Sequence, residues 1–451
     1  MGSIDSHPSH TLASVIKSDM LAPDMMRFIS HIPHRATRRA LRLLAVLACG
    51  LGAARGAENW PEFRGPRGDG ESLASGLPVA FSETQNARWK TPVHGKAWSS
   101  PVVWDQQVWV TTATKDGTQL GALCVDAESG RIIHDVVIYQ IAKPEFCHPM
   151  NSYGTPTPVI EQGRVYLHFG SYGTACLDTT TAKVLWTRQD FSCNHFRGPA
   201  SSPIRIGDLL VLTFDGVDAQ FLVALDKTSG KTVWKRDRQI VYETAEPDYH
   251  KAYSTPAILT VNGRQQLVSP SAGATIAYEP ITGAEIWRVR SGGMNAAARP
   301  LFGNGLVFAT SAAGGDQLFA VRPDGRGDVT DTHVAWKYSK NVPTRSSQIL
   351  LGDRLFMISD AGVISCVNAN SGQSVWQKRL GGSFSASPLY SHGKIYFFGE
   401  EGEVPVVAAA DDYQLLSNNR LGDGFMASPA VYEHSLILRS RTHLYRVNAS
   451  R

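Results

Sequence analysis

Cysteine and histidine gather in three short polar stretches that each lie ahead of an apolar strand. Cys147 and His148 are adjacent, Cys193 and His195 share the second stretch, and His250 stands in the third. Imidazole and thiolate side chains ligate zinc and copper in proteins. The stretches also carry Lys and Arg, which bind anionic groups. These residues therefore indicate a ligand-binding function that works through a metal or through an anion.

Five of the six cysteines fall into two groups, and the sixth, Cys49, lies near the N-terminus. Cys124, Cys176 and Cys366 occupy a slot that holds Ala in other copies of a repeat, which favours a small buried site in the core. Cys147 and Cys193 occupy equivalent loops before Pro158 and Pro203. In an exported protein these two could form a disulfide, whose geometry one sequence does not fix. Metal ligation and free thiols remain open alternatives for the pair.

A repeated phrase determines where these stretches must lie. Its clearest copy runs from Ala224 to Trp234 and reads as strand, turn and strand, with Asp226 and Gly230 supplying the turn. His134 replaces the tryptophan in the first copy. A repeat of about 40 to 50 residues with several short strands is typical of a propeller blade. The tryptophans expected to dock one blade on the next are Trp89, Trp186, Trp234, Trp287, Trp336 and Trp376.

A second phrase, Ser or Thr followed by Pro and an apolar strand, keeps the same spacing and marks eight blade starts. The starts are Ser100-Pro101, Thr157-Pro158, Ser202-Pro203, Thr255-Pro256, Arg299-Pro300, Ser347-Gln348, Ser387-Pro388 and Ser428-Pro429. The last copy ends before its outer strand. We expect the strand around Trp89 to complete it, which would remove the open edges of the ring. The sequence thus predicts an all-β, eight-bladed propeller over residues 87–451.

Loops that lead into the inner strands of a propeller emerge on one face. His148, His195 and His250 should therefore line one sector of the channel mouth, on blades 2–4. Asn151, Arg197, Lys251, Arg299 and Arg345 occupy similar loops. We predict a polar, ligand-binding mouth there. The alternative is that these polar loops only hydrogen-bond one another. The sequence contains no Gly-x-Ser-x-Gly, His-Glu-x-x-His or Walker motif, so we assign no catalytic residue.

Residues 1–57 are expected to be a leader rather than part of the fold. Four arginines precede the apolar run Leu43–Ala54, which is too short to span a bilayer and fits the core of a signal peptide. Thr37-Arg38-Arg39 weakly resembles a twin-arginine signal. Cys49 is a weak candidate for lipid attachment. We expect an exported protein, periplasmic or extracellular, followed by an extended Gly/Pro-rich segment at 58–86.

Charge excludes one class of partner. The leader holds seven of the 44 basic and three of the 40 acidic residues, so 37 of each remain in the body of the chain. A neutral body gives no electrostatic reason to bind nucleic acid or an anionic membrane. We expect a monomer that takes a protein or a small molecule as its ligand.

The repeated phrase, over about residues 87–448, resembles the tryptophan-docking repeat of pyrroloquinoline quinone (PQQ)-type propellers. That family includes the quinoprotein alcohol dehydrogenases and the outer-membrane-protein assembly lipoprotein. The opening Asn59–Pro66 further resembles secreted bacterial PQQ-like proteins. The dehydrogenases close adjacent cysteines over their cofactor, and this chain has no such pair, so the resemblance assigns the quinone to no residue here.

Three functions follow as hypotheses. The first is an exported binding or scaffold protein with its ligand at the mouth. The second is a periplasmic quinoprotein-like oxidoreductase. The third is an outer-membrane protein assembly factor that holds peptide by strand addition or surface contact.

Overall fold

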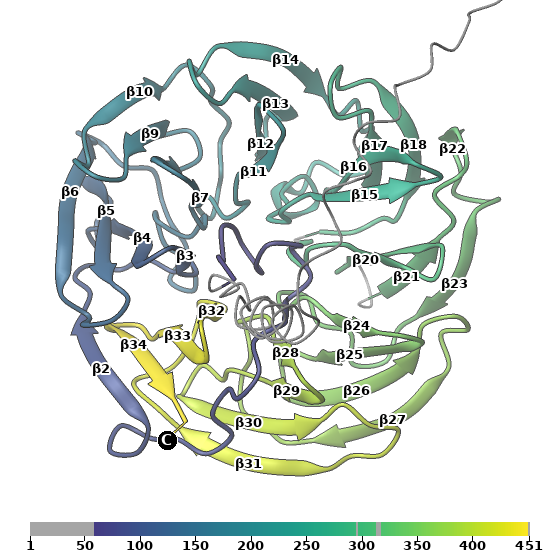
Figure 1. Cartoon of the computed structure of the whole chain (residues 1–451). Coiled ribbons are helices and arrows are strands. Elements are labelled where there is room, and N and C mark those ends of the chain that lie inside the picture. The colour runs from purple at the N-terminus through teal and green to yellow at the C-terminus, as the bar shows by residue number, and fades with distance from the viewer. Residues whose placement is uncertain (1–57, 295, 313–316, 450–451) are drawn as a thin grey trace, which may run out of the picture. The chain divides into compact units, whose positions relative to one another are not determined.

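The computed structural model describes residues 58–294, 296–312 and 317–449. The leader predicted for residues 1–57, including Cys49, lies outside the described residues. In the described part, eight antiparallel sheets stand around one axis as the blades of a propeller (Figure 1). The described chain contains no α-helix, only the 3₁₀ turn η2 (Pro247–Tyr249).

Each of the first four blades runs from an inner to an outer strand in chain order. Blade 1 holds β3 (Val102–Trp104), β4 (Gln107–Ala113), β5 (Gln119–Asp126) and β6 (Ile132–Gln140). Blade 2 holds β7 (Val159–Glu161), β8 (Arg164–His168), β9 (Thr174–Asp178) and β10 (Val184–Arg188). Blade 3 holds β11 (Ile204–Ile206), β12 (Leu209–Asp215), β13 (Gln220–Asp226) and β14 (Thr232–Asp237). Blade 4 holds β15 (Ala257–Val261), β16 (Arg264–Pro270), β17 (Ala274–Tyr278) and β18 (Glu285–Arg290), with the added edge strand β22 (Gly327–Asp328).

The remaining blades repeat this order, except that the last one borrows a strand. Blade 5 holds β19 (Leu301–Gly303), β20 (Leu306–Ser311), β21 (Gln317–Val321) and β23 (Val334–Tyr338). Blade 6 holds β24 (Ile349–Leu351), β25 (Arg354–Ile358), β26 (Val363–Asn368) and β27 (Ser374–Arg379). Blade 7 holds β28 (Leu389–Ser391), β29 (Lys394–Tyr396), β30 (Glu403–Ala408) and β31 (Leu415–Arg420), with β1 (Glu71–Ser72) beside β28. Blade 8 holds β32 (Ala430–Tyr432), β33 (Ser435–Arg439), β34 (His443–Asn448) and β2 (Ala87–Pro92).

The repeat tryptophans occupy matching positions opposite a small residue of their own blade, except Trp89, which lies opposite Arg446. Trp186 and Trp376 face Cys176 and Cys366, whereas Trp234 faces Ala224. The indole N–H then donates to a backbone carbonyl in the turn of the next blade at 2.9–3.1 Å, for Trp89, Trp186, Trp234, Trp336 and Trp376. The slot that alternates between Ala and Cys is therefore small because a large ring packs over it.

Glycine in the turn lets the next blade approach the ring. Gly230 has φ +69°, and a Cβ placed there would lie 2.8 Å from the Trp186 ring. In the same turn the Asp226 carboxylate accepts from the Ser229 backbone N–H and hydroxyl at 2.7 and 2.6 Å. Asp126, Asp178 and Asn368 make the equivalent contacts in their own turns. These contacts are the turn chemistry that the repeated phrase predicts.

Two blades replace the direct tryptophan contact by a glutamine relay. In blade 4 the Trp287 indole donates to Gln266, whose amide donates to the Pro323 carbonyl of blade 5. In blade 1, where His134 stands in the tryptophan slot, Trp109 donates to Gln107, which reaches the Thr179 carbonyl of blade 2. The docking contact is thus kept even where the repeated phrase is worn.

A belt of hydrogen bonds links the inner ends of the blades. At seven of the eight blade starts, a Ser or Thr hydroxyl accepts from the backbone N–H at the same position of the preceding blade, at 2.8–3.0 Å. The last of these bonds runs from the Ser428 N–H to the Ser100 hydroxyl and returns the belt to blade 1. The belt is interrupted at Arg299, which stands in place of the eighth hydroxyl.

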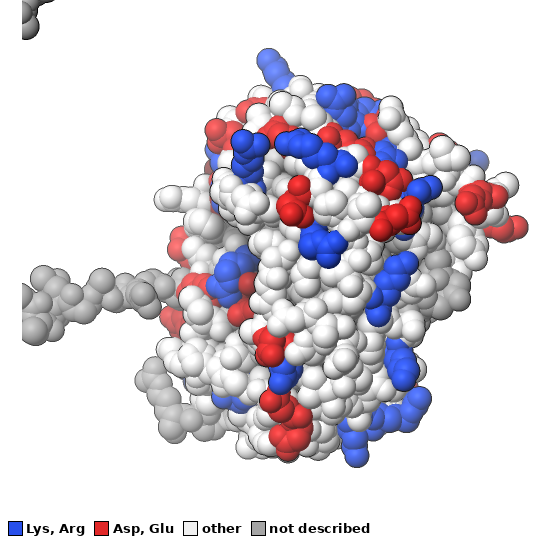
Figure 2. All heavy atoms as spheres, turned by 90° about the vertical axis from the view of Figure 1, so that its right-hand side faces the viewer, with Lys and Arg blue, Asp and Glu red and all other residues white. Residues whose placement is uncertain are grey.

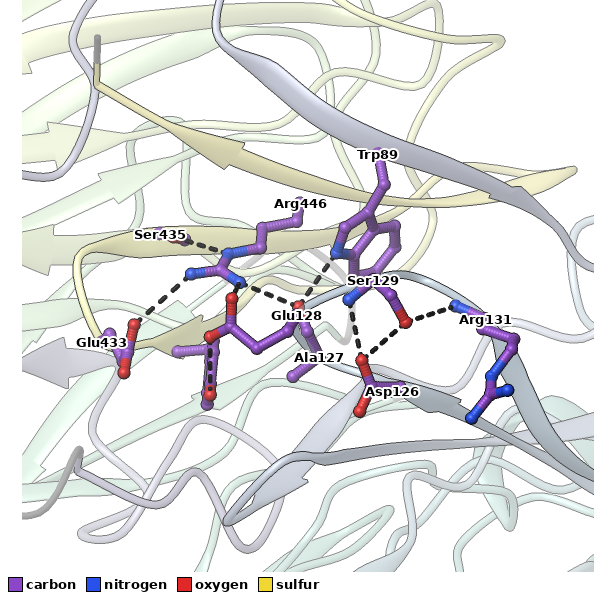
Figure 3. A network of polar contacts seen from close by, with 10 residues as sticks. Trp89, Asp126, Ala127, Glu128, Ser129, Arg131, Glu433, Ser435 and Arg446 are labelled. Atoms are coloured by element: carbon purple, nitrogen blue, oxygen red, sulfur yellow. Dashed lines mark hydrogen bonds and ion pairs between the residues drawn. The ribbon is translucent and has the colours of Figure 1, made fainter. Parts of the chain in front are cut away.

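Blade 8 and blade 1 meet at a polar network (Figure 3). Trp89 on β2 donates to the Ala127 carbonyl, and Arg446 on β34 contacts Glu128 at 2.6 Å and Glu433 at 3.4 Å. The Tyr432 hydroxyl donates to Glu128 at 2.9 Å. β2 pairs antiparallel with β34 from Ala87 to Pro92, so residues near both ends of the described chain share one sheet.

The segment that precedes β2 crosses the axis and closes one end of the channel. Figure 1 shows this purple stretch in the middle of the ring. Trp60 exchanges two backbone hydrogen bonds with Val103 of blade 1, and Pro61 accepts from Ile160 of blade 2. Arg64 reaches the Gln348 carbonyl of blade 6. The guanidinium of Arg299, from blade 5, donates to the Phe63 carbonyl and pairs with Glu62 at 2.8 Å.

One face of the outer surface mixes both signs of charge (Figure 2). On the face drawn in Figure 2, which is the right-hand side of Figure 1, basic and acidic side chains lie beside one another. That face therefore offers no single-sign field. Among the described residues, no helix is long and apolar enough to cross a membrane.

Candidate ligand-binding cavity at the channel mouth

A cavity of about 500 Å³ opens at the end of the axis away from the crossing segment. Its walls come from all eight blades, chiefly from the loops before the inner strands, so it is broader than the mouth predicted on blades 2–4. The lining residues are Trp98, His148, Met150, Asn151, Thr155, Arg197, Ala200, Tyr253, Ala297, Thr344, Arg345, Asp360, Ser385 and Met426.

Four of the eight residues predicted for the mouth line this cavity: His148, Asn151, Arg197 and Arg345. Asn151 also holds the wall together, because its amide donates to the Arg197 and Pro199 carbonyls at 3.0 and 3.2 Å. His195, Lys251 and Arg299 are buried and do not line the cavity, and neither does His250. Arg299 serves instead as the anchor of the crossing segment.

Each arginine of the cavity wall is paired with acid. Arg197 contacts Asp248 at 2.5 Å. Arg345 contacts Asp360 at 2.9 Å and Glu400 at 3.0 Å. The cavity therefore brings together cationic and anionic groups that already neutralise one another. A ligand would have to compete with these carboxylates to gain charge–charge contact.

The apolar part of the wall was not predicted. Trp98, Met150, Tyr253 and Met426 supply it, and Met150 is half exposed. A smaller cavity of about 280 Å³ adjoins the first, since both are lined by Trp98, Met150 and Met426. Flexible thioethers and aromatic rings fit ligands of varied shape. Position could have found three of them, because Trp98, Tyr253 and Met426 each stand four residues ahead of an inner strand.

The three predicted histidines do not converge on one ion. Both ring nitrogens of His250 face backbone carbonyls, Val217 O at 3.1 Å and Thr244 O at 2.7 Å. His195 is used by Ser171 N and Lys251 Nζ, at 3.0 and 3.2 Å. In the described part of the chain, no three His, Cys, Asp or Glu side chains are placed to hold a metal. The geometry thus gives the three-histidine metal hypothesis no support.

Cys147 and Cys193 are both free thiols. Cys147 lies behind the cavity wall with its Sγ 3.7 Å from the Arg197 carbonyl. Cys193 is buried against His195. Burial raises the pKa of Cys147 to about 11 and that of Cys193 to about 12. Neither thiol is therefore activated as a nucleophile.

Eight sheets, docked chiefly by tryptophans around one axis, define a propeller of the PQQ-repeat class. The family model described as outer membrane protein assembly factor BamB matches residues 79–237, 218–358 and 334–417, and the chain belongs to this family.

The relatives include both assembly factors of the BamB type and quinoprotein dehydrogenases. The chain is 24% identical over 308 residues to BamB of Shewanella oneidensis, covering 63% of this chain and 72% of that protein. It is 27% identical over 196 residues to the quinoprotein ethanol dehydrogenase of Pseudomonas aeruginosa, covering 42% of this chain and 30% of that enzyme.

Two solved structures share the fold. BamB of Moraxella catarrhalis has a TM-score of 0.57 at 15% identity, covering 80% of this chain and 99% of that one. The quinohemoprotein alcohol dehydrogenase of Comamonas testosteroni has a TM-score of 0.63 at 10% identity, covering 88% and 82%. At such identities these similarities establish the fold alone.

The cavity does not fit the quinone of the dehydrogenase branch. That cofactor bears several carboxylates and needs unpaired cations around it. Arg197 and Arg345 are committed to Asp248, Asp360 and Glu400. The donor set of this wall suits an apolar or weakly charged ligand better than a polycarboxylate.

Proposed function

We propose that the protein is an exported binding or scaffold protein whose ligand occupies the axial cavity. The observation that carries the proposal is the cavity itself: it opens at one end of the channel, while the crossing segment closes the other. A concave site with apolar walls and a few polar groups is the usual form of a ligand pocket.

The wall supports an elongated, mainly apolar ligand with hydrogen-bond acceptors. Trp98, Tyr253 and the two methionines give the apolar contact. The Trp98 indole N–H is buried and has no partner in the described structure, so Trp98 offers the ligand its ring surface rather than that donor. Arg197 and Arg345, held by their carboxylates, would orient rather than neutralise the ligand.

Export is part of this proposal. It rests on the arginines before Leu43–Ala54 and on the family match, since that family is described as an outer membrane protein assembly factor. We propose a leader at 1–57, a crossing segment at 58–86 and a monomeric propeller at 87–451. Mass spectrometry of the secreted protein would show whether the mature N-terminus lies near residue 57.

The cavity can be tested with 1-anilino-8-naphthalenesulfonate, a fluorescent probe that is largely apolar. Ala200 lines the cavity, and Ala200→Trp would fill part of it. We expect the wild type to bind the probe saturably and Ala200→Trp to lose most of that binding. Val241→Trp, at a residue 92% exposed, is the matched control and should bind as the wild type does. Equal binding by all three proteins, with unchanged circular dichroism, would place the probe elsewhere and refute the cavity as a binding site.

A second candidate is a factor in outer-membrane protein assembly. The family match and the BamB relatives favour it. Affinity purification of the tagged protein from its own cells, after reversible crosslinking, should then recover components of the outer-membrane assembly machinery. If none of these components is recovered, the assembly-factor hypothesis is wrong, whereas the proposal of a ligand-binding protein still stands.

A quinoprotein-like oxidoreductase is the third candidate, and the dehydrogenase relatives are its only support. Titration with pyrroloquinoline quinone, followed by absorbance after desalting, decides it. The paired arginines predict that no stoichiometric chromophore is retained. A retained quinone would favour the enzyme.

A further inference from the structure

A buried lysine stands behind the cavity wall with an unusual partner. Lys251 is 2% exposed and His195 is 5% exposed. The Nζ of Lys251 lies 3.2 Å from Nδ1 of His195 and 4.8 Å from the centre of the Tyr253 ring. Tyr253 lines the cavity, so this amine lies against a residue of the cavity wall.

The hydrogen-bond partners of His195 determine which of its ring nitrogens carries the proton. The backbone N–H of Ser171 points at Nε2 of His195 at 3.0 Å, and a backbone amide can only donate. Nε2 is therefore the acceptor nitrogen of a neutral imidazole, and its proton sits on Nδ1. Nδ1–H must donate in turn, and two acceptors lie within its reach: Nζ of Lys251 at 3.2 Å, which is the nearer, and Sγ of Cys193 at 3.7 Å.

An ammonium group cannot accept that bond, because it has three donors and no lone pair. A doubly protonated His195 is excluded by the Ser171 N–H, which would then face another N–H. Burial also lowers the pKa of His195 well below its usual range. The contact is therefore a hydrogen bond only when Lys251 is a neutral amine.

The surroundings agree with an uncharged lysine. Burial lowers the pKa of Lys251, opposed by Cys193 and Asp215. Asp215 is committed to Arg238, which it contacts at 2.6 and 2.8 Å. No carboxylate within the described chain forms an ion pair with Lys251, whereas Lys227 pairs with Glu161 at 3.0 Å. The other titratable or charged groups around the cluster are His168 near His195, Asp218 near Cys193, and Arg197, Asp248 and Cys147 near Tyr253.

We propose that Lys251 is an uncharged amine, held by His195, that can capture a small aldehyde or ketone entering from the axial cavity. A desolvated neutral lysine is a nucleophile toward carbonyl compounds. The amine nitrogen forms a C=N bond, the C=O bond breaks, and the carbonyl oxygen leaves as water with the two amine protons. The Tyr253 ring must move aside for the carbonyl to reach Nζ. The inference does not depend on which ligand fills the cavity.

The first test reads the protonation state directly. Protein labelled with ¹³C and ¹⁵N in lysine alone is titrated by NMR, and Lys251→Met assigns the resonance. We expect the Lys251 signal to be that of a neutral amine at neutral pH, while the other lysines remain charged. A Lys251 signal that titrates together with the exposed lysines would overturn the proposal.

The second test reads reactivity. Formaldehyde with cyanoborohydride at neutral pH should methylate Lys251 selectively, as located by peptide mass spectrometry, and Tyr253→Ala should speed the labelling. His195→Gln presents an oxygen that accepts from an ammonium, so labelling of Lys251 should be lost while the circular dichroism spectrum is kept. If Lys251 is neutral by NMR yet unlabelled in both the wild type and Tyr253→Ala, carbonyl capture is wrong. Probe binding in the axial cavity would be unaffected by that failure.

Discussion

The belt of Ser and Thr hydrogen bonds between the blades predicts how much stability the fold loses when one hydroxyl acceptor is removed. Thr157 Oγ1 accepts from the Ser100 N–H at 2.9 Å, and both residues are at most 3% exposed. Thr157→Val keeps the shape of the side chain but removes the acceptor. The Ser100 N–H is then left buried without a partner, which costs about 1–3 kcal/mol. Thr157→Ser keeps the acceptor and loses one methyl group, worth about 0.8 kcal/mol.

The two variants separate hydrogen bonding from packing. Urea unfolding followed by tryptophan fluorescence should rank their stability as wild type, then Thr157→Ser, then Thr157→Val. Hydrogen exchange read by mass spectrometry should show faster exchange of the peptide containing Ser100 in Thr157→Val alone. If Thr157→Val is no less stable than Thr157→Ser, and Ser100 exchanges at the same rate in both, the belt does not stabilise the ring.

Four further changes test other parts of the fold. Trp234→Ala removes a docking ring and should lower the free energy of unfolding by about 3–5 kcal/mol in chemical denaturation. Arg299→Met leaves Glu62 unpaired, and residues 58–72 should exchange hydrogen faster than in the wild type while the blades do not. Burial raises the pKa of Glu128, but hydrogen bonds from Arg446 and Tyr432 outweigh burial, so the pKa of this carboxyl is lower in the folded protein than in the unfolded chain. The ionised carboxylate therefore stabilises the fold at pH values above its unfolded pKa, and this stabilisation is lost as the pH falls through its folded pKa. Glu128→Gln should therefore lose less stability than the wild type between about pH 7 and about pH 3. Native protein should react with a thiol reagent first at Cys147, which is only half-buried, and peptide mapping that finds Cys124 modified first would contradict the burial pattern.

The fold could be predicted because its determinants are local and repeated. The turn around Asp226 and Gly230, the small slot at Ala224 and the ring of Trp234 recur in register, so each copy supports the others. The glutamine relay of Gln107 could not be predicted, since it depends on which strand faces the next turn. Single-copy departures from a repeat acquire meaning only when their neighbours in space are known.

The residues of the site were harder to predict than the fold, because loop conformation depends on contacts that the spacing of residues in the sequence does not encode. His195 and Lys251 stand in mouth loops, yet their side chains turn inward and pair with each other. Trp98 and Met426, which do line the cavity, resemble core residues in the sequence. Polar type alone therefore selected four residues that line the cavity and four that do not.

Native mass spectrometry tests the central claim most directly. The protein is purified gently from its own cells, as wild type and as Ala200→Trp, and sprayed intact and then denatured. The account predicts that the wild type carries a ligand mass that denaturation releases, and that Ala200→Trp does not carry it. A wild type that carries no ligand, or the same ligand on both proteins in equal amount, would contradict the claim that the axial cavity is the binding site.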